Sequence, residues 1–150
     1  MTTITTTRSR RAPSQYLRSL WSTTGHLMLC AAYLQGAMTK LLNFEDAIQE
    51  MRHFGLRPEA PLAVALILFE ITASAMVISG CFRWIGAGAL CMFTVLASFI
   101  ALRFWELPAG MQQTMAMNAF FEHVGLAGAF LLLAGHDLAK RWQTGARWTR

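Results

Sequence analysis

Four long stretches of this 150-residue sequence are almost free of charged side chains, and this distribution limits the possible folds more than any other feature. They cover about residues 17–40, 61–80, 84–103 and 116–135, and each approaches the roughly 20 apolar residues that a membrane-spanning helix needs. Only 14% of the chain is charged, against about 25% in soluble domains. The sequence therefore predicts an all-α polytopic membrane protein, an antiparallel bundle of four transmembrane helices within residues 16–138.

The segment between the first two predicted spans has helical periodicity. Phe44, Ile48 and Met51 recur at helical spacing, and charged residues lie elsewhere around the same wheel. Gly55 and Pro58 mark its end. This pattern predicts a short amphipathic helix on the outer membrane surface.

The two ends of the chain are polar and basic. Residues 1–15 are rich in Thr and Arg and are predicted to be a disordered tail, whereas residues 139–150 are predicted to be a basic cytoplasmic tail. With four spans, nine Lys and Arg residues fall on the side of the two termini and four on the opposite side. The positive-inside rule therefore predicts that both termini are cytoplasmic.

Several classes of function are disfavoured by the sequence. The basic residues flank apolar helices and form no recognition motif, so we expect contact with the lipid bilayer and no nucleic-acid binding. Cys30, Cys81 and Cys91 are widely separated, which favours free thiols over thiol–disulfide exchange. No pair of residues has the spacing of a metal site, so we expect no metal. The chain has no ligand set of its own for haem, flavin or an iron–sulfur cluster, so we expect no intrinsic cofactor.

Polar residues inside the spans are the candidates for function. Counting about 1.5 Å per residue places Glu70 roughly 13 Å, and Glu122 and His123 roughly 9–11 Å, below the outer boundary. Lys40 lies at the outer end of the first span. We therefore expect a polar cluster of Lys40, Glu70, Glu122 and His123, lined by Gln35 and Asn118.

Within this cluster we expect His123 to pair with Glu70, Lys40 to reach toward either acid, and Glu122 to accept a proton. Three interpretations stay open: interhelical hydrogen bonding alone, a ligand, quinone or proton-relay site, and a contact with a partner subunit. The sequence assigns no catalytic residue. His26, in the inner half of the bundle, is expected to make an interhelical hydrogen bond.

Small residues four positions apart let helices approach closely in membranes. Ala32 and Gly36 form such a pair in the first span, and Gly125 and Ala129 form another in the last. We expect helix packing at both pairs.

Several motifs in chain order resemble those of the DoxX family of small four-helix bacterial membrane proteins. GAMTKLLNF (36–44) resembles the family's Gly-x-x-x-Lys-x-x-x-Phe at the end of its first helix, and MRHFGL followed by Pro58 resembles its stretch before the second. Glu70 stands where the family has a mid-helix glutamate. SGCFRWIGA (79–87) resembles its Gly-x-x-x-Arg turn, although Arg83 follows Gly80 by three residues. NAFFEHVGLAGAFLLLAG (118–135) resembles its final helix. The resemblance covers about residues 17–137.

One position departs from the family pattern. Family members commonly carry a basic residue followed by Asn where this chain has Glu122 and His123. If the family's basic residue pairs with the glutamate at position 70, then His123 or Lys40 takes over as the cation here, or one acid is protonated.

The resemblance implies a bacterial inner-membrane location and a role as a subunit or accessory of a quinone-linked respiratory or redox complex. Some relatives are subunits of a thiosulfate:quinone oxidoreductase, and others are associated with redox-stress complexes or cofactor maturation. A quinone and a redox partner subunit, or a second copy of the chain, are the implied ligand and partner. The alternatives are a small-solute or ion carrier and a purely structural membrane scaffold.

Overall fold

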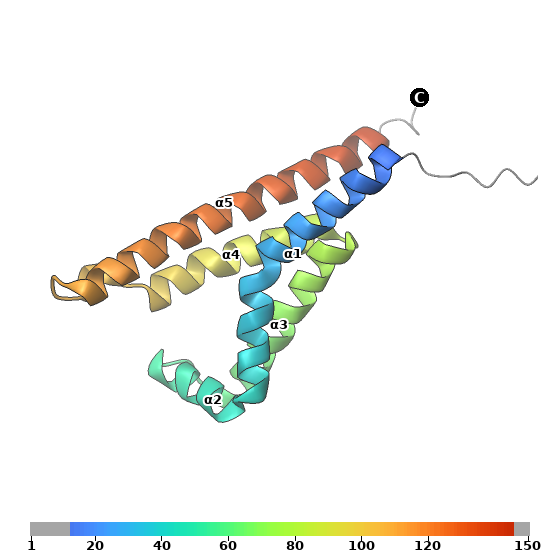
Figure 1. Ribbon diagram of the computed structural model, residues 1–150. Coiled ribbons are helices and arrows are strands. Elements are labelled where there is room, and N and C mark those ends of the chain that lie inside the picture. The colour runs from blue at the N-terminus through green and yellow to red at the C-terminus, as the bar shows by residue number, and fades with distance from the viewer. Residues whose placement is uncertain (1–12, 146–150) are drawn as a thin grey trace, which may run out of the picture.

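The computed structural model describes residues 13–145, and within this part of the chain every regular element is helical (Figure 1). The all-α prediction is therefore confirmed. The elements are α1 (Pro13–Leu42), α2 (Phe44–His53), α3 (Glu59–Ser79), α4 (Arg83–Ala101), the short 3-10 helix η1 (Phe104–Glu106) and α5 (Met111–Gly145).

Three helical segments of the described chain are long and apolar enough to cross a membrane: Glu59–Ser79, Arg83–Glu106 and Met111–Gln143. They cover the last three predicted spans, apart from Gly80 at the end of the span predicted at 61–80, so the chain is an all-α membrane protein. The first predicted span lies within α1, which is 30 residues long but carries more polar residues and is not among the three. The fourth crossing stays a prediction.

The helix ends differ from the predicted tails. Residues 13–15 belong to α1, although they fall in the tail predicted to be disordered, and the rest of that tail lies outside the described residues. At the other end α5 continues to Gly145, so residues 139–145 of the predicted basic tail are helical.

The predicted amphipathic helix is present as α2. Its Ala47 and Met51 are buried against Ala63 of α3, whereas its charged residues are exposed. Gly55 has a φ of 69°, and a residue without a Cβ adopts this left-handed conformation at little cost. It lets the chain turn from α2 toward α3.

The helices form two arms that meet at one end of the molecule (Figure 1). The start of α1 and the end of α5 lie side by side at this end, near the turn between α3 and α4. From there α1 and α3 diverge from α4 and α5, and we call these pairs the first arm and the second arm. The molecule is therefore a bundle at one end and a fork at the other.

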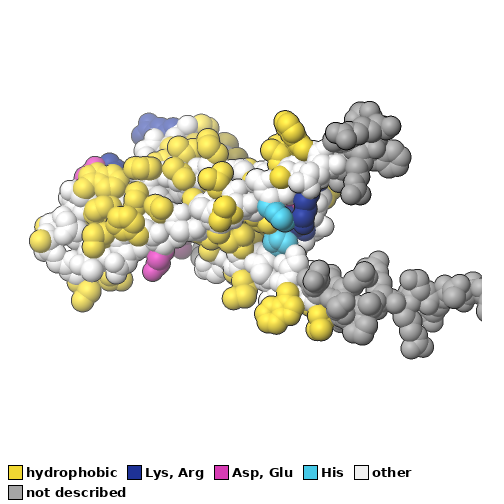
Figure 2. Space-filling view, turned by 90° about the horizontal axis from the view of Figure 1, so that it is seen from above, with side chains coloured by type: hydrophobic (Ala, Val, Ile, Leu, Met, Phe, Trp, Pro, Cys, Tyr) yellow, Lys and Arg dark blue, Asp and Glu magenta, His cyan; other side chains and the backbone are white. Residues whose placement is uncertain are grey.

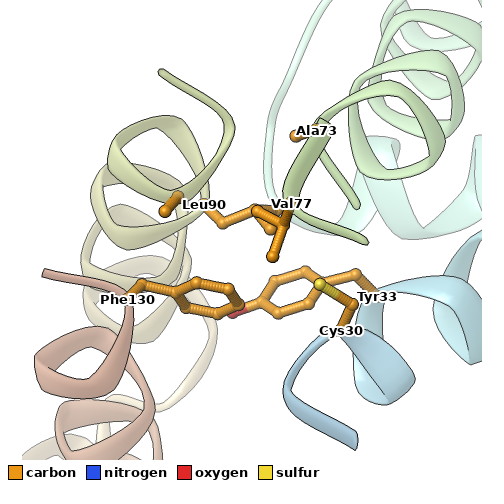
Figure 3. Close-up of a cluster of buried hydrophobic side chains, with 7 residues drawn as sticks. Cys30, Tyr33, Ala73, Val77, Leu90 and Phe130 are labelled. Carbon is orange, nitrogen blue, oxygen red and sulfur yellow. The ribbon is translucent and has the colours of Figure 1, made fainter. Parts of the chain in front are cut away.

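A compact core joins the arms where they meet (Figure 3). Tyr33 of α1 and Phe130 of α5 point toward each other, with ring centroids 5.5 Å apart in an edge-to-face arrangement. The Tyr33 hydroxyl also hydrogen-bonds the Thr94 hydroxyl of α4. The buried members of this core are Cys30, Tyr33, Ala73, Val77, Ala87, Leu90 and Phe130.

Gly86 brings α3 and α4 into direct backbone contact. A Cβ at this position would lie 2.8 Å from both the Ala73 carbonyl oxygen and the Met76 Cβ, closer than real Cβ atoms approach. By contrast, Gly125 and Ala129 are exposed, and no atom of another helix comes within 4 Å of where a Gly125 Cβ would stand. Within residues 13–145, Gly125 therefore has no close helix contact, because α5 turns Ala127 and Phe130 inward instead, while Ala129 lines an open hollow beside α1.

Large apolar side chains cover the outside of the long helices. Met28, Leu132 and Leu68 are 74%, 77% and 59% exposed, respectively. Figure 2 shows hydrophobic side chains along the length of one face, with His and basic side chains near the end from which the terminal segments leave. Such a surface suits contact with lipid.

Candidate functional site

A cavity of about 170 Å³ lies at the fork, between the two arms. The first arm contributes Lys40 from α1 and Glu70 from α3, and the second contributes Thr94 from α4 and His123 from α5. We call it the fork cavity; its walls include Tyr33, Gly36, Lys40, Glu70, Thr94 and His123. Three of the predicted site residues therefore meet here.

Lys40 and Glu70 form an ion pair across the first arm. The Lys40 Nζ lies 3.5 Å from Glu70 Oε1, and the two side chains are 15% and 6% exposed. Charge-assisted hydrogen bonds are usually about 2.7–2.9 Å long, so this pair is loose. The ammonium compensates the carboxylate without saturating it.

The second carboxylate oxygen of Glu70 is the most unusual atom of the site. Glu70 Oε2 is buried and has no hydrogen-bond partner among the described residues. A buried polar atom without a partner costs about 1–3 kcal/mol, and more if it is charged. Most buried polar atoms in proteins are satisfied, so this oxygen has a hydrogen-bonding capacity that the described residues leave unused.

Gly36 makes room for the pair. A Cβ at this position would lie 3.5 Å from Lys40 Nζ and 3.8 Å from each Glu70 oxygen, which is ordinary contact distance. Alanine therefore fits there, whereas a larger side chain enters the space that the pair occupies. Gly36 was predicted to let another helix approach closely. In the structure, the space beside it is occupied by the side chains of Lys40 and Glu70 and not by the backbone of another helix.

One ring nitrogen of His123 is hydrogen-bonded to the backbone of its own helix. Its Nδ1 lies 2.7 Å from the Ala119 carbonyl oxygen, and because a carbonyl only accepts, Nδ1 carries the proton and donates. In the neutral ring Nε2 is then an acceptor. The tautomer is thus set by the helix itself, and a second nitrogen is left for a ligand or proton.

The other predicted cluster members lie elsewhere. Glu122 and Asn118 are exposed on α5 and are not part of the fork cavity. Successive helix residues point about 100° apart, so turning His123 into the cavity turns Glu122 away from it. Gln35 is also exposed, and its side chain donates to the Thr39 hydroxyl at 3.0 Å.

The pairing of the acid differs from the expectation as well. Glu70 was expected to pair with His123, whereas its ionic partner in the structure is Lys40. The reason is that Lys40 and Glu70 belong to adjacent helices of the same arm, while His123 stands on the opposite arm.

Tyr33 and Thr94 also line the site, although neither was predicted from the sequence. Tyr33 is 6% exposed and Thr94 is 1% exposed, and the Thr94 hydroxyl donates to the Leu90 carbonyl at 2.6 Å. The helical spacing of Tyr33, Gly36 and Lys40 was the available signal, because it places all three on the face of α1 that turns toward the other helices.

His26 lies near the opposite end of the molecule. It is 8% exposed and lines an open hollow between α1 and α5 together with His136. No hydrogen bond of its ring is recorded within residues 13–145, so the expected interhelical bond is not confirmed.

Comparisons with known proteins concern mainly the first four helices. A family model described as DoxX matches residues 23–103. The inner membrane protein YphA of Escherichia coli (strain K12) is 26% identical over 95 residues, which make up 63% of this chain and 67% of YphA. No solved structure matches. Lys40 and Glu70 fall inside the segment matched by the family model, whereas His123 lies beyond it.

Proposed function

The chain belongs to the DoxX family, and from this membership we propose that it is a quinone-binding subunit or accessory of a redox complex in the bacterial inner membrane. The name of YphA supports the location, and the apolar helices agree with it. The fork cavity is the proposed quinone site.

The observation that carries the proposal is the unpartnered Glu70 Oε2 beside a cavity. Ionisable side chains are rare in membrane-spanning helices and commonly mark ligand or proton sites. Here the acid has one loose ionic partner and one free oxygen, and a second titratable residue, His123, lines the same cavity. This arrangement suits a ligand with two oxygen atoms on a small ring.

A quinone bound in the cavity would supply a carrier for two electrons and two protons. The Lys40 ammonium can donate a hydrogen bond to a carbonyl oxygen of the ring. Glu70 Oε2 and His123 Nε2 can each accept a hydrogen bond from a hydroxyl and hold its proton. Lys40 also compensates the negative charge of Glu70 before its carboxylate takes up a proton.

Electron transfer belongs, in this proposal, to a partner subunit. The sequence contains only three cysteines, Cys30, Cys81 and Cys91, and they lie far apart along the chain. It carries no ligand set for an iron–sulfur cluster or haem of its own. The chain therefore binds the carrier and exchanges protons with it.

The ion pair itself favours a second function. Lys40 and Glu70 connect α1 to α3, and polar contacts of this kind also stabilise helix packing in scaffolds without any chemistry. A carrier of small solutes or ions is the third alternative, because buried acids line many transport pathways.

Binding of a quinone with a very short tail, measured by equilibrium dialysis on the protein in lipid nanodiscs, separates these functions. We expect Glu70→Gln and His123→Ala to weaken binding at least tenfold, with the melting temperature recorded in parallel to identify loss of folding. Glu122→Gln is the matched control, because it neutralises an exposed acid adjacent to His123, and it should bind as the wild type does.

Three outcomes contradict the proposal. If the wild type binds no quinone and Glu70→Gln lowers the melting temperature, the ion pair belongs to a scaffold. If Glu70→Gln lowers the melting temperature without weakening quinone binding, the pair is structural and the fork cavity is not the quinone site. Uptake of a solute into liposomes that Glu70→Gln abolishes, in the absence of quinone binding, identifies a carrier.

A further inference from the structure

An apolar groove extends from the fork between the two arms. One cavity of about 510 Å³ and another of about 270 Å³ share the side chains of Met51, Leu56, Leu66, Phe93 and Leu96. Because they share these walls, they form one hollow between α2 and α3 on one side and α4 on the other. We call this hollow the arm groove.

The arm groove meets the fork cavity at α4. Phe93 and Ala97 line both the 270 Å³ part of the groove and the fork cavity, and they stand one helical turn apart on the same face of α4. The fork cavity, which Glu70 with its unpartnered carboxylate oxygen lines, therefore lies directly beside the groove. The groove itself is lined mainly by hydrocarbon side chains.

The surroundings of the groove are apolar. Its walls on α3 and α4 belong to segments that are apolar enough to cross a membrane. Glu50 is the single charged residue along its walls within the described chain, and it stands on α2 at the edge of the groove. A ligand in this hollow therefore presents hydrocarbon to most of it and polar atoms to the fork cavity alone.

We propose that the arm groove holds the isoprenoid tail of the quinone whose head occupies the fork cavity, so that the ligand class is the long-tailed quinones. This inference rests on the proposed function. The two hollows lie side by side along α4, and their lining changes from polar in the fork cavity to apolar in the groove, which suits this occupant. The tail enters between the arms and passes under α2.

A transmembrane helix of a partner suits the groove less well. A helix with its side chains is about 10–12 Å wide, whereas the larger part of the groove, about 510 Å³, has the volume of a small-molecule pocket, about 300–1,000 Å³ in most proteins, and the other part, about 270 Å³, is smaller still. Met51 of α2 and Met92 of α4 line the groove, and methionine side chains adapt readily to flexible apolar ligands.

The test compares two quinones with the same head in nanodiscs of a defined phospholipid, one without a tail and one with several isoprene units. Empty nanodiscs correct for partitioning of the long-tailed compound into lipid. We expect the wild type to bind the long-tailed quinone at least tenfold more tightly. Ala65→Phe, which fills the groove from α3, should remove this difference and leave binding of the tailless quinone unchanged.

Ala75→Phe is the matched control, because it makes the same substitution on the same helix at an exposed position outside the groove walls. It should leave both affinities as in the wild type. A long-tailed quinone with a photoreactive group at the tail end should label α2 or the groove face of α4, at Met51 or Leu96.

The two proposals fail in different ways. If the tailless quinone binds and the long-tailed one binds no more tightly, the tail assignment is wrong while the head site stands. If labelling falls on Val95, which is exposed on α4 outside the groove walls, the tail lies in bulk lipid and the assignment is again wrong. A phospholipid that co-purifies and is not displaced by the long-tailed quinone identifies an acyl chain as the occupant. If neither quinone binds, both proposals are wrong.

Discussion

Replacing Lys40 and replacing Glu70 should lower the free energy of unfolding by unequal amounts, and we expect the larger loss for Lys40. Lys40→Met removes the charge with little change in side-chain length, and Glu70→Gln removes the opposite charge with almost no change in shape. Lys40 stands two residues before the end of α1 at Leu42, whereas Glu70 lies in the middle of α3. An unpaired Lys40 can therefore extend toward the membrane surface, but an unpaired Glu70 cannot leave the bundle.

The distance between the two charges sets an upper limit on how much their attraction can stabilise the fold. Two unit charges 3.5 Å apart attract each other by about 4.7 kcal/mol at an effective dielectric constant of about 20. Loss of hydration offsets part of this attraction, so we expect Lys40→Met to lower the free energy of unfolding by about 2–4 kcal/mol. Glu70→Gln should cost about 1 kcal/mol, and the double variant should resemble Glu70→Gln.

Unfolding in mixed micelles of a mild detergent and SDS measures these differences, with loss of helix signal followed by circular dichroism. The double-mutant cycle isolates the interaction between the two side chains, provided that the four proteins fold to the same helix content. If Glu70→Gln costs as much as Lys40→Met, or if the double variant costs the sum of the two, the pair is not coupled as the structure indicates.

Three further predictions concern packing and orientation. Gly86→Ala should destabilise the protein by about 1–3 kcal/mol, because its Cβ meets the α3 backbone; Gly88→Ala, which has no neighbour within 4 Å, should be neutral or stabilising in the same unfolding assay. Tyr33→Phe should cost about 1 kcal/mol in that assay through loss of its buried hydrogen bond, and an unchanged stability would contradict that role. Cys81 is exposed at the turn after α3, whereas Cys30 is buried. A membrane-impermeant maleimide should therefore label Cys81 from the cytoplasmic side, and labelling from the opposite side would reverse the predicted orientation.

The sequence alone determined the fold class and most of the elements. A stretch of about 20 uncharged apolar residues has few stable alternatives to a helix in lipid, and this local rule placed α3, α4 and α5. The spacing of Phe44, Ile48 and Met51 was enough to predict α2, because a short amphipathic helix is also a local pattern. The tail boundaries were less well predicted, since helix ends depend on weak signals.

Residue positions along the predicted helices also placed Lys40, Glu70 and His123 at similar depths in the outer half of the membrane. Depth says nothing about rotation, and the rotation of each helix is set by the core that joins the arms. In α5 the burial of Phe130 turns His123 toward the fork cavity and Glu122 outward. This is why half of the predicted cluster lies outside the site.

The tertiary structure alone decided that the bundle opens into two arms. Tyr33 and Phe130 bring α1 to α5 at one end, and beyond that contact the pairs separate, because α1 packs on α3 and α4 packs on α5. Hydropathy is the same for a closed bundle and for a fork, since each presents apolar surface to lipid. The fork cavity, the free oxygen of Glu70 and the arm groove all follow from this opening, and they depend on contacts between residues far apart in the chain.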